Sequence, residues 1–278
     1  MIEIEKIPPA VAGGILTALS GGQPPEYGVS LYTEGLGSVI DIIEKMQLRQ
    51  MVTCGNGFDK IIVAPFGHGK THFIRTFREI AMSQNPPLAC SEISLDAGNL
   101  NLKELDLVFY EIMRQIEFPK DDDEISKCII TPAVIAQKRG FRQAFESWLN
   151  EKKDELISQG HDEDKYFDFI ENLRSRILKD PIMKPAFKQT IHLLLNGFRE
   201  SDYTTINDVE MFFQGDLSTQ GIRKHGLAKI TSDNALIYIE SLVSLLKVLK
   251  FGGLMISFDE GEYQNFSRSD KSRTDVLK

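Results

Sequence analysis

The chain has 278 residues, of which 42% are apolar and 26% charged, an ordinary globular composition with room for one large core or two smaller ones. Its net charge of −8 argues against a surface built mainly to contact a phosphate backbone, although a local basic patch stays compatible with it. No run of 18 apolar residues occurs and the start is acidic rather than basic, so we expect a cytoplasmic protein without a membrane span or signal peptide. Cys54, Cys90 and Cys128 lie far apart and predict buried thiols rather than a disulfide framework or a metal site.

The first part of the chain predicts two helices. Residues 7–20 can form the first, because prolines open it and Gly21-Gly22 followed by Pro24-Pro25 ends it. Residues 39–48 predict the second, in which Val39, Ile42, Ile43 and Met46 share one face at helical spacing.

A strand, a glycine-bearing loop and a helix are predicted next. Residues 59–64 are a short apolar strand, and residues 71–82 are a helix with four apolar side chains turned inward, namely Phe73, Ile74, Phe77 and Ile80 or Ala81. Residues 88–95 predict a second strand that returns beside the first, as a parallel crossover requires. We therefore expect a βαβ unit over residues 59–95.

The middle of the chain has a helical pattern. Residues 102–213 predict a helical insertion, with Trp148 in its core and acidic stretches at 121–124 and 151–165 that suit solvated surfaces better than cation sites. A long helix at 232–249 and a buried strand at 254–258 follow. The expected fold is an α/β P-loop NTPase core, a parallel sheet flanked by helices, in three segments: 1–100, the helical insertion 101–231, and 232–278.

Residues 64–71 fit a phosphate-binding loop, with Ala64 in place of the usual first glycine. Gly67 and Gly69 allow successive backbone N–H groups to curl around an anion at the start of the following helix. Lys70 would reach the β and γ phosphates, and the Thr71 hydroxyl would ligate Mg²⁺. The predicted nucleotide-binding residues are Ala64, Pro65, Phe66, Gly67, His68, Gly69, Lys70, Thr71 and His72. The alternative for the loop is a structural glycine turn.

The strand at 254–258 delivers Asp259 and Glu260 to its carboxyl end, where open α/β sheets bind ligands. Asp259 would hold Mg²⁺ through water, so the predicted metal ligands are Thr71 and Asp259. Glu260 would orient the attacking water, and with Lys70 it forms the predicted catalytic pair. Glu262 is a less favoured substitute for Glu260, and a strand that merely reaches a solvated turn is the structural alternative.

Other polar residues suit structural roles better. His68 and His72 can touch nucleotide, but surface or packing roles are the simpler interpretation. Glu92 and Asp96 lie near the end of the second predicted strand, where some ATPases keep a catalytic acid, although Asp96 suits a loop cap. Five basic residues fit solvated helix faces, with basic patches for a partner or a nucleic acid as the alternative: Arg75, Arg78, Lys138, Arg139 and Arg142.

Three stretches together resemble bacterial P-loop ATP-binding proteins of the BREX phage-defence type. They are residues 12–22, the run Gly67-His68-Gly69-Lys70-Thr71-His72-Phe73-Ile74-Arg75, and residues 246–262 with the ending Asp259-Glu260-Gly261-Glu262. The resemblance implies an AAA-like or RecA-like ATPase core, with Lys70 and Thr71 at nucleotide and metal and Asp259 and Glu260 in hydrolysis. It also suggests work on DNA or within a defence complex.

Relatives of this kind continue beyond the Asp-Glu strand, through segments expected to supply a sensor residue and an arginine finger, whereas this sequence stops at Lys278. We therefore expect ATP and Mg²⁺ as ligands, and hydrolysis that depends on a protein partner or another copy of the chain. A nucleotide-gated or inactive scaffold, whose insertion recruits a partner, is the alternative. A GTPase or small-molecule kinase is a weaker one, since the chain has no Asn-Lys-x-Asp guanine signature.

Overall fold

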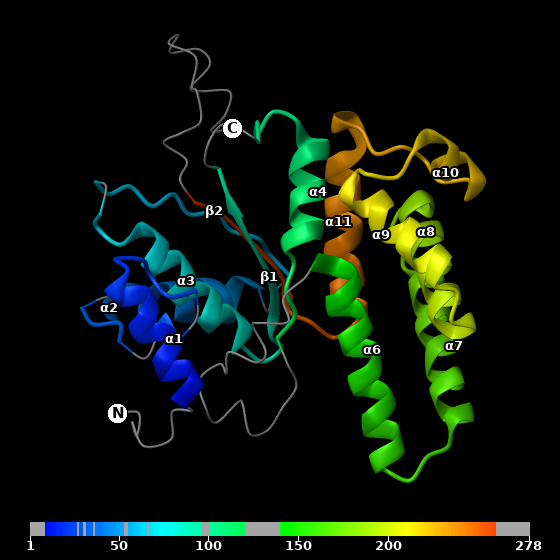
Figure 1. Cartoon of the computed structure of the whole chain (residues 1–278), viewed down its shortest axis with the longest axis horizontal. Helices are drawn as coiled ribbons and strands as arrows, with labels where there is room; N and C mark the ends of the chain where they lie inside the picture. Colours follow the sequence, from blue (N-terminus) through cyan, green and yellow to red (C-terminus); the bar gives the residue numbers. More distant parts are fainter. Residues whose placement is uncertain are drawn as a thin grey trace.

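The computed structural model describes residues 9–26, 28–29, 32–35, 37–52, 55–65, 67–95, 100–119 and 140–259. Within them the chain is mixed α/β, with a small parallel sheet and many helices (Figure 1). The two strands are β1 (Leu88–Ser94) and β2 (Gly253–Asp259). The helices before the sheet are α1 (Pro9–Ser20), α2 (Gly37–Ile43), the π-helix η3 (Glu44–Val52) and α3 (Lys70–Met82). Between the strands lie α4 (Leu105–Gln115), α6 (Gly140–Ser158), α7 (Glu163–Lys179), α8 (Pro185–Glu200), α9 (Tyr203–Gln214), α10 (Thr219–Lys224) and α11 (Ser232–Val248).

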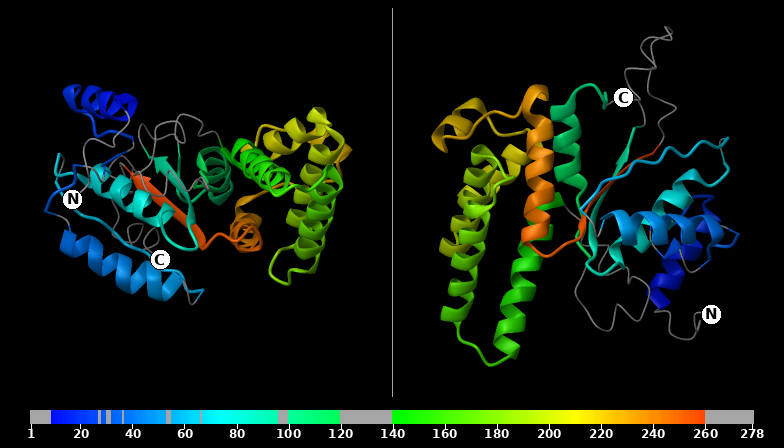
Figure 2. Two further views of the ribbon diagram at one scale, coloured as in Figure 1. Left: turned by 90° about the horizontal axis from the view of Figure 1, so that it is seen from below. Right: turned by 180° about the vertical axis from the view of Figure 1, so that it is seen from behind.

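The sheet joins two segments that are far apart in the sequence. β1 and β2 pair in parallel, with Leu88 opposite Gly253 and Ser94 opposite Asp259. Helices cover both faces: α3 lies on one side, and α4 with α11 on the other (Figures 1 and 2). Because side chains alternate along a strand, each strand contributes to both layers. The strands thus lie between α3 on one side and, on the other, a helical bundle that consists of α4, α6, α7, α8, α9 and α11.

The larger core forms between the sheet and the bundle. Ala89 and Ile93 of β1 join one buried cluster with side chains of α4, α6, α7, α8, α9 and α11. Trp148 packs against this cluster and lies near the rings of Phe145 and Phe169, which confirms the prediction that it belongs to the core of the helical region. Helix α11 belongs to the same cluster, so it is packed as part of the bundle.

A smaller core lies between the sheet and α3. Phe77 and Ala81 of α3 are buried with Leu88 and Cys90 of β1 and with Leu48 of η3. Ile74 is also buried, and Phe73 and Ile80 are partly buried, so the predicted inward face of this helix is confirmed. The prediction of a buried thiol holds for Cys90; burial raises the pKa of that thiol. Cys54 and Cys128 lie outside the described residues.

Two predictions about the first half of the chain are wrong. The structure forms no strand over residues 59–64, where Ile61 is 69% and Val63 89% exposed. Consequently β1 does not return beside that segment but pairs with β2, whose backbone offers a complete register from residue 253 to 259. A strand needs a partner for its backbone groups, and β2 meets this need for β1.

The second helix also differs from the expectation. It is divided into α2 and the π-helix η3, and the face that carries Val39, Ile42 and Met46 is exposed. The buried side chains of this region are Ile40 and Leu48. No helix among the described residues is long and apolar enough to cross a membrane.

Candidate nucleotide-binding site

The loop before α3 is shaped by two glycines in the left-handed region. Gly67 has φ 79° and Gly69 has φ 82°, a conformation that residues with a Cβ adopt only at a cost. Gly69 is the N-cap of α3, and no side chain caps the helix there. The loop residues 67–69 are exposed, so the N–H groups of the first turn face a region that solvent or an anion can reach.

Lys70 is the first residue of α3 and folds back over the loop. Its Nζ donates to the carbonyl oxygens of Ala64, at 3.2 Å, and Pro65, at 3.5 Å. The backbone N–H of His68 also donates to the Pro65 carbonyl, at 3.3 Å. The ammonium group therefore lies inside the curve of the loop, close to where the sequence places phosphate.

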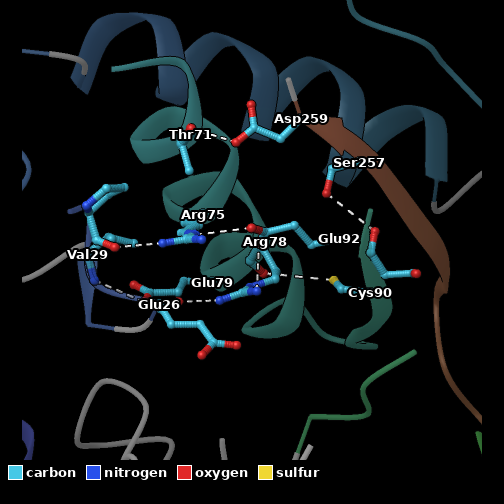
Figure 3. Close-up of polar contacts among 12 residues, drawn as sticks. Glu26, Val29, Thr71, Arg75, Arg78, Glu79, Cys90, Glu92, Ser257 and Asp259 are labelled. Carbon is cyan, nitrogen blue, oxygen red and sulfur yellow. Dashed lines mark hydrogen bonds and ion pairs between the residues drawn. The ribbon is translucent and has the colours of Figure 1, made fainter. Parts of the chain in front are cut away.

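Thr71 and Asp259 meet at the carboxyl end of β2. The Thr71 hydroxyl donates to Oδ2 of Asp259 at 2.5 Å (Figure 3). Asp259 is the last residue of β2 and is buried, and its carbonyl accepts the N–H of Leu95 at 2.9 Å. The pairing with β1 thus fixes the backbone that carries this carboxylate, and the structure brings together the two residues that the sequence predicts as metal ligands.

His72 contacts the segment at residues 32–33. Its Nε2 lies 2.9 Å from the Thr33 hydroxyl, and its ring centroid is 5.1 Å from that of Tyr32. Burial lowers the pKa of His72, and the nearby Glu79 carboxylate opposes this effect in part. The lowered pKa favours the neutral form of the His72 ring, which packs against residues 32–33, while His68 is exposed on the loop.

Arg75 and Arg78 are not on a solvated helix face, and they form no exposed basic patch, so both sequence interpretations of these residues are wrong. Arg75 Nε donates to Glu92 Oε1 at 3.0 Å, and Arg78 Nη1 to Glu92 Oε2 at 2.7 Å (Figure 3). Arg78 is 1% exposed. Both arginines lie inside the protein because the Glu92 carboxylate of β1 pairs with them. From the sequence, Glu92 is considered only as a catalytic acid.

The same arginines hold the segment that follows α1. Arg75 Nη1 donates to the carbonyls of Pro24, at 2.6 Å, and Pro25, at 3.2 Å, and Arg78 Nη2 donates to the Glu26 carbonyl. The buried Glu79 accepts the N–H of Val29 at 3.0 Å. Sequence reasoning missed these contacts. The only local signal was the cluster of charges in Arg75-x-x-Arg78-Glu79 on a helix whose other face is apolar.

Some predicted residues lie outside the described ranges, namely Phe66, Asp96, Lys138, Arg139, Glu260 and Glu262. Arg142 is described and pairs with Glu210 at 2.9 Å in the helical bundle. Among the described residues, no group of three or more His, Cys, Asp or Glu side chains is arranged to hold a metal ion.

Comparison with curated proteins and with solved structures finds no match. A family model does match: the one described as BREX system ATP-binding protein BrxC/D covers residues 7–277. This range includes the loop, helix α3 and both strands. Since the match spans nearly the whole sequence, the chain belongs to the family of BREX system ATP-binding proteins BrxC/D.

Proposed function

We propose that the chain binds ATP with Mg²⁺ at residues 64–72 and hydrolyses the nucleotide in a step coupled to a partner. The observation that carries the proposal is the hydrogen bond between Thr71 and Asp259. It brings the first turn of α3 and the carboxyl end of β2 to one place, and the family to which the chain belongs is ATP-binding.

The residues fit a nucleotide with its metal. The space beside the loop is open at Gly67, since a Cβ there would meet nothing within 4 Å. The Thr71 hydroxyl and the Asp259 carboxylate supply oxygen atoms, which Mg²⁺ prefers. Lys70 supplies a positive charge beside the loop, where it can neutralise phosphate oxygens.

Each residue then has a distinct role. Lys70 would exchange the carbonyls of Ala64 and Pro65 for phosphate oxygens and so bind and orient the nucleotide. Thr71 and Asp259 would hold the metal, directly and through water respectively. Bound Mg²⁺ supplies electrostatic stabilisation of the phosphate oxygens. Glu260, which follows Asp259 directly, would orient the attacking water.

The proposal includes the architecture around this site. We infer a P-loop core that uses residues 1–100 and 232–278, with residues 101–231 inserted between the loop and the Asp259-Glu260 strand. The packing of α3 on one face of the sheet, and of α4 with α11 on the other, is compatible with this arrangement. The bundle is then the natural place for a partner to act on the site, and we propose a role in phage defence, on DNA or with another protein of that system.

The experiment is an ATP-binding and turnover assay with the purified chain. The wild-type chain should bind a fluorescent ATP analogue and release phosphate in the presence of Mg²⁺, alone or with its partner. Glu260→Gln should keep binding and lose turnover, and Glu262→Gln is the matched control that should keep both. Unlabelled ATP should displace the analogue better than GTP does. A wild-type chain that binds no ATP would disprove the proposal, and loss of turnover in Glu262→Gln alone would move the hydrolytic role to that residue.

One observation favours a second function, a nucleotide-gated or inactive scaffold. Residues 59–64, which lead into the loop, form no strand, and Ile61 and Val63 are largely exposed. A loop that is followed by a helix but is not preceded by a paired strand is less firmly positioned. Hydrolysis depends on such positioning. Measurable turnover that disappears in Glu260→Gln would exclude this alternative.

A further inference from the structure

Helix α3 contacts the sheet through polar groups at two points on one side. Near its start the Thr71 hydroxyl meets Asp259 of β2 at 2.5 Å, and one turn later Arg75 meets Glu92 of β1 at 3.0 Å (Figure 3). Glu92 lies opposite Ser257 in the sheet register. Since Ser257 and Asp259 are two residues apart on one strand, Glu92 and Asp259 face the same side of the sheet.

The spacing of these two contacts matches the geometry of the elements. Thr71 and Arg75 are four residues apart on a helix, which corresponds to about 6 Å of rise. The step from the level of Glu92 to that of Asp259 is two residues of strand, about 6.6 Å. The helix can therefore make both contacts at once in the position that it takes along the sheet.

Glu92 fixes this position by its charge. It receives Arg75 on one carboxylate oxygen and Arg78, at 2.7 Å, on the other, and Arg78 is almost fully buried. Without the carboxylate, both arginines would lose their ionic contact with β1, and a buried pair that loses one partner is strongly unfavourable. The helix would then move outward at the turn next to Thr71.

We propose that Glu92, acting through Arg75 and Arg78, is a positioning residue for the metal-binding part of the nucleotide site. It holds α3 where the Thr71 hydroxyl stands opposite the Asp259 carboxylate. This inference rests on the proposed ATP site. It assigns Glu92 no contact with nucleotide or metal, so its effect should appear in the metal-dependent part of the affinity.

The test compares the affinity for a fluorescent ATP analogue in Mg²⁺ and in EDTA. Glu92→Gln keeps the size of the side chain and removes its charge. We expect its affinity to fall at least fivefold in Mg²⁺ and less than twofold in EDTA, because phosphate contacts of the loop and Lys70 remain. The matched control is Glu210→Gln in the bundle, since the side chains of Arg142 and Glu210 are 23% and 21% exposed, against 20% and 12% for Arg75 and Glu92. This control should leave both affinities within twofold of the wild type.

The possible results separate positioning from general stability. An equal loss in Mg²⁺ and EDTA, a loss of the same size in Glu210→Gln, or unchanged affinity of Glu92→Gln in Mg²⁺ would each overturn the proposal. If circular dichroism shows that Glu92→Gln does not fold, Arg75→Lys replaces it, because Lys keeps the charge but cannot contact both Glu92 and the Pro24 carbonyl. The affinity of Arg75→Lys for the ATP analogue should fall at least twofold in Mg²⁺ but not in EDTA. An unchanged affinity for the analogue in Mg²⁺ would refute the inference. No binding by the wild-type chain would disprove the ATP site itself.

Discussion

The hydroxyl of Thr71 donates a hydrogen bond to the carboxylate of Asp259, although 188 residues separate the two in the sequence. Thr71 belongs to the first turn of α3, directly after the loop, and Asp259 ends β2. The contact joins the start of α3 to the last described residue of the chain. It also holds together two oxygen-bearing groups that a magnesium ion could share.

Removal of the Thr71 hydroxyl should weaken nucleotide binding only when metal is present. Thr71→Val keeps the shape and loses both the contact with Asp259 and a metal ligand. A hydrogen bond to a charged group is worth about 1.5–3 kcal/mol, so the affinity for ATP in Mg²⁺ should fall roughly tenfold or more. Isothermal titration in Mg²⁺ and in EDTA measures this. Thr71→Ser, which keeps the hydroxyl, should stay near the wild type, and an equal loss in both variants would mean that the methyl group matters instead.

Lys70→Ala should abolish detectable ATP binding while the fold remains. The ammonium group contacts the Ala64 and Pro65 carbonyls and is expected to turn to the β and γ phosphates. Each charged contact is worth about 1.5–3 kcal/mol. The loss of these contacts should therefore raise the Kd for ATP by more than about a hundredfold. Lys60→Ala, in the exposed segment before the loop, is the control and should bind as the wild type does. If Lys70→Ala keeps its affinity for ATP, the assignment of the loop is wrong.

The sequence predicts the elements whose signal is local. The apolar spacing in residues 73–81 predicts the buried face of α3, and the run at 254–258 predicts β2 with an acidic end, as the structure has them. The loop glycines have the positive φ that their role requires. Periodicity and backbone preference act within a few residues, so a single sequence is enough to see them.

Long-range pairing could not be predicted in the same way. Nothing in residues 59–64 reveals that β1 takes β2 as its partner, because an apolar run is equally compatible with a strand and with an exposed extended segment. Arg78 has the sequence features of a solvated helix residue, and its burial follows from Glu92, fourteen positions later on β1. The fold of the candidate nucleotide site was therefore predictable at the loop and at β2, but not in the contacts that position α3.

A methyl group at Gly252 should destabilise the protein. Gly252 leads into β2, and its N–H donates to the Pro87 carbonyl at 2.7 Å. A Cβ there would lie 2.8 Å from the Pro86 carbonyl oxygen, so Gly252→Ala forces the starts of β1 and β2 apart. Overpacking of this kind costs about 1–3 kcal/mol, which urea unfolding would show as a lower midpoint. Gly57→Ala is the control, because a Cβ at that exposed position meets nothing within 4 Å, and a similar loss in both variants would contradict the steric explanation.

The stability of the chain should fall as the pH drops below about 6.5. Burial lowers the pKa of His72, and burial together with the neighbouring Arg174 guanidinium lowers that of His192. The unfolded chain, with histidine near its usual pKa of about 6.5, then binds protons that the folded chain does not. Stability therefore rises with pH through this window and is lost as the pH falls toward the folded-state pKa values.

Urea unfolding at pH 7.5 and pH 5.5 without nucleotide measures this effect. The wild-type chain should have the lower free energy of unfolding at pH 5.5, and His72→Gln and His192→Gln should each reduce the difference, because glutamine does not titrate. His161 is exposed, so His161→Gln should leave the difference as in the wild type. Carboxyl groups near their usual pKa remain ionised over this range and contribute little. An unchanged pH dependence in both His72→Gln and His192→Gln would show that these partly buried rings are not the groups that take up protons on unfolding.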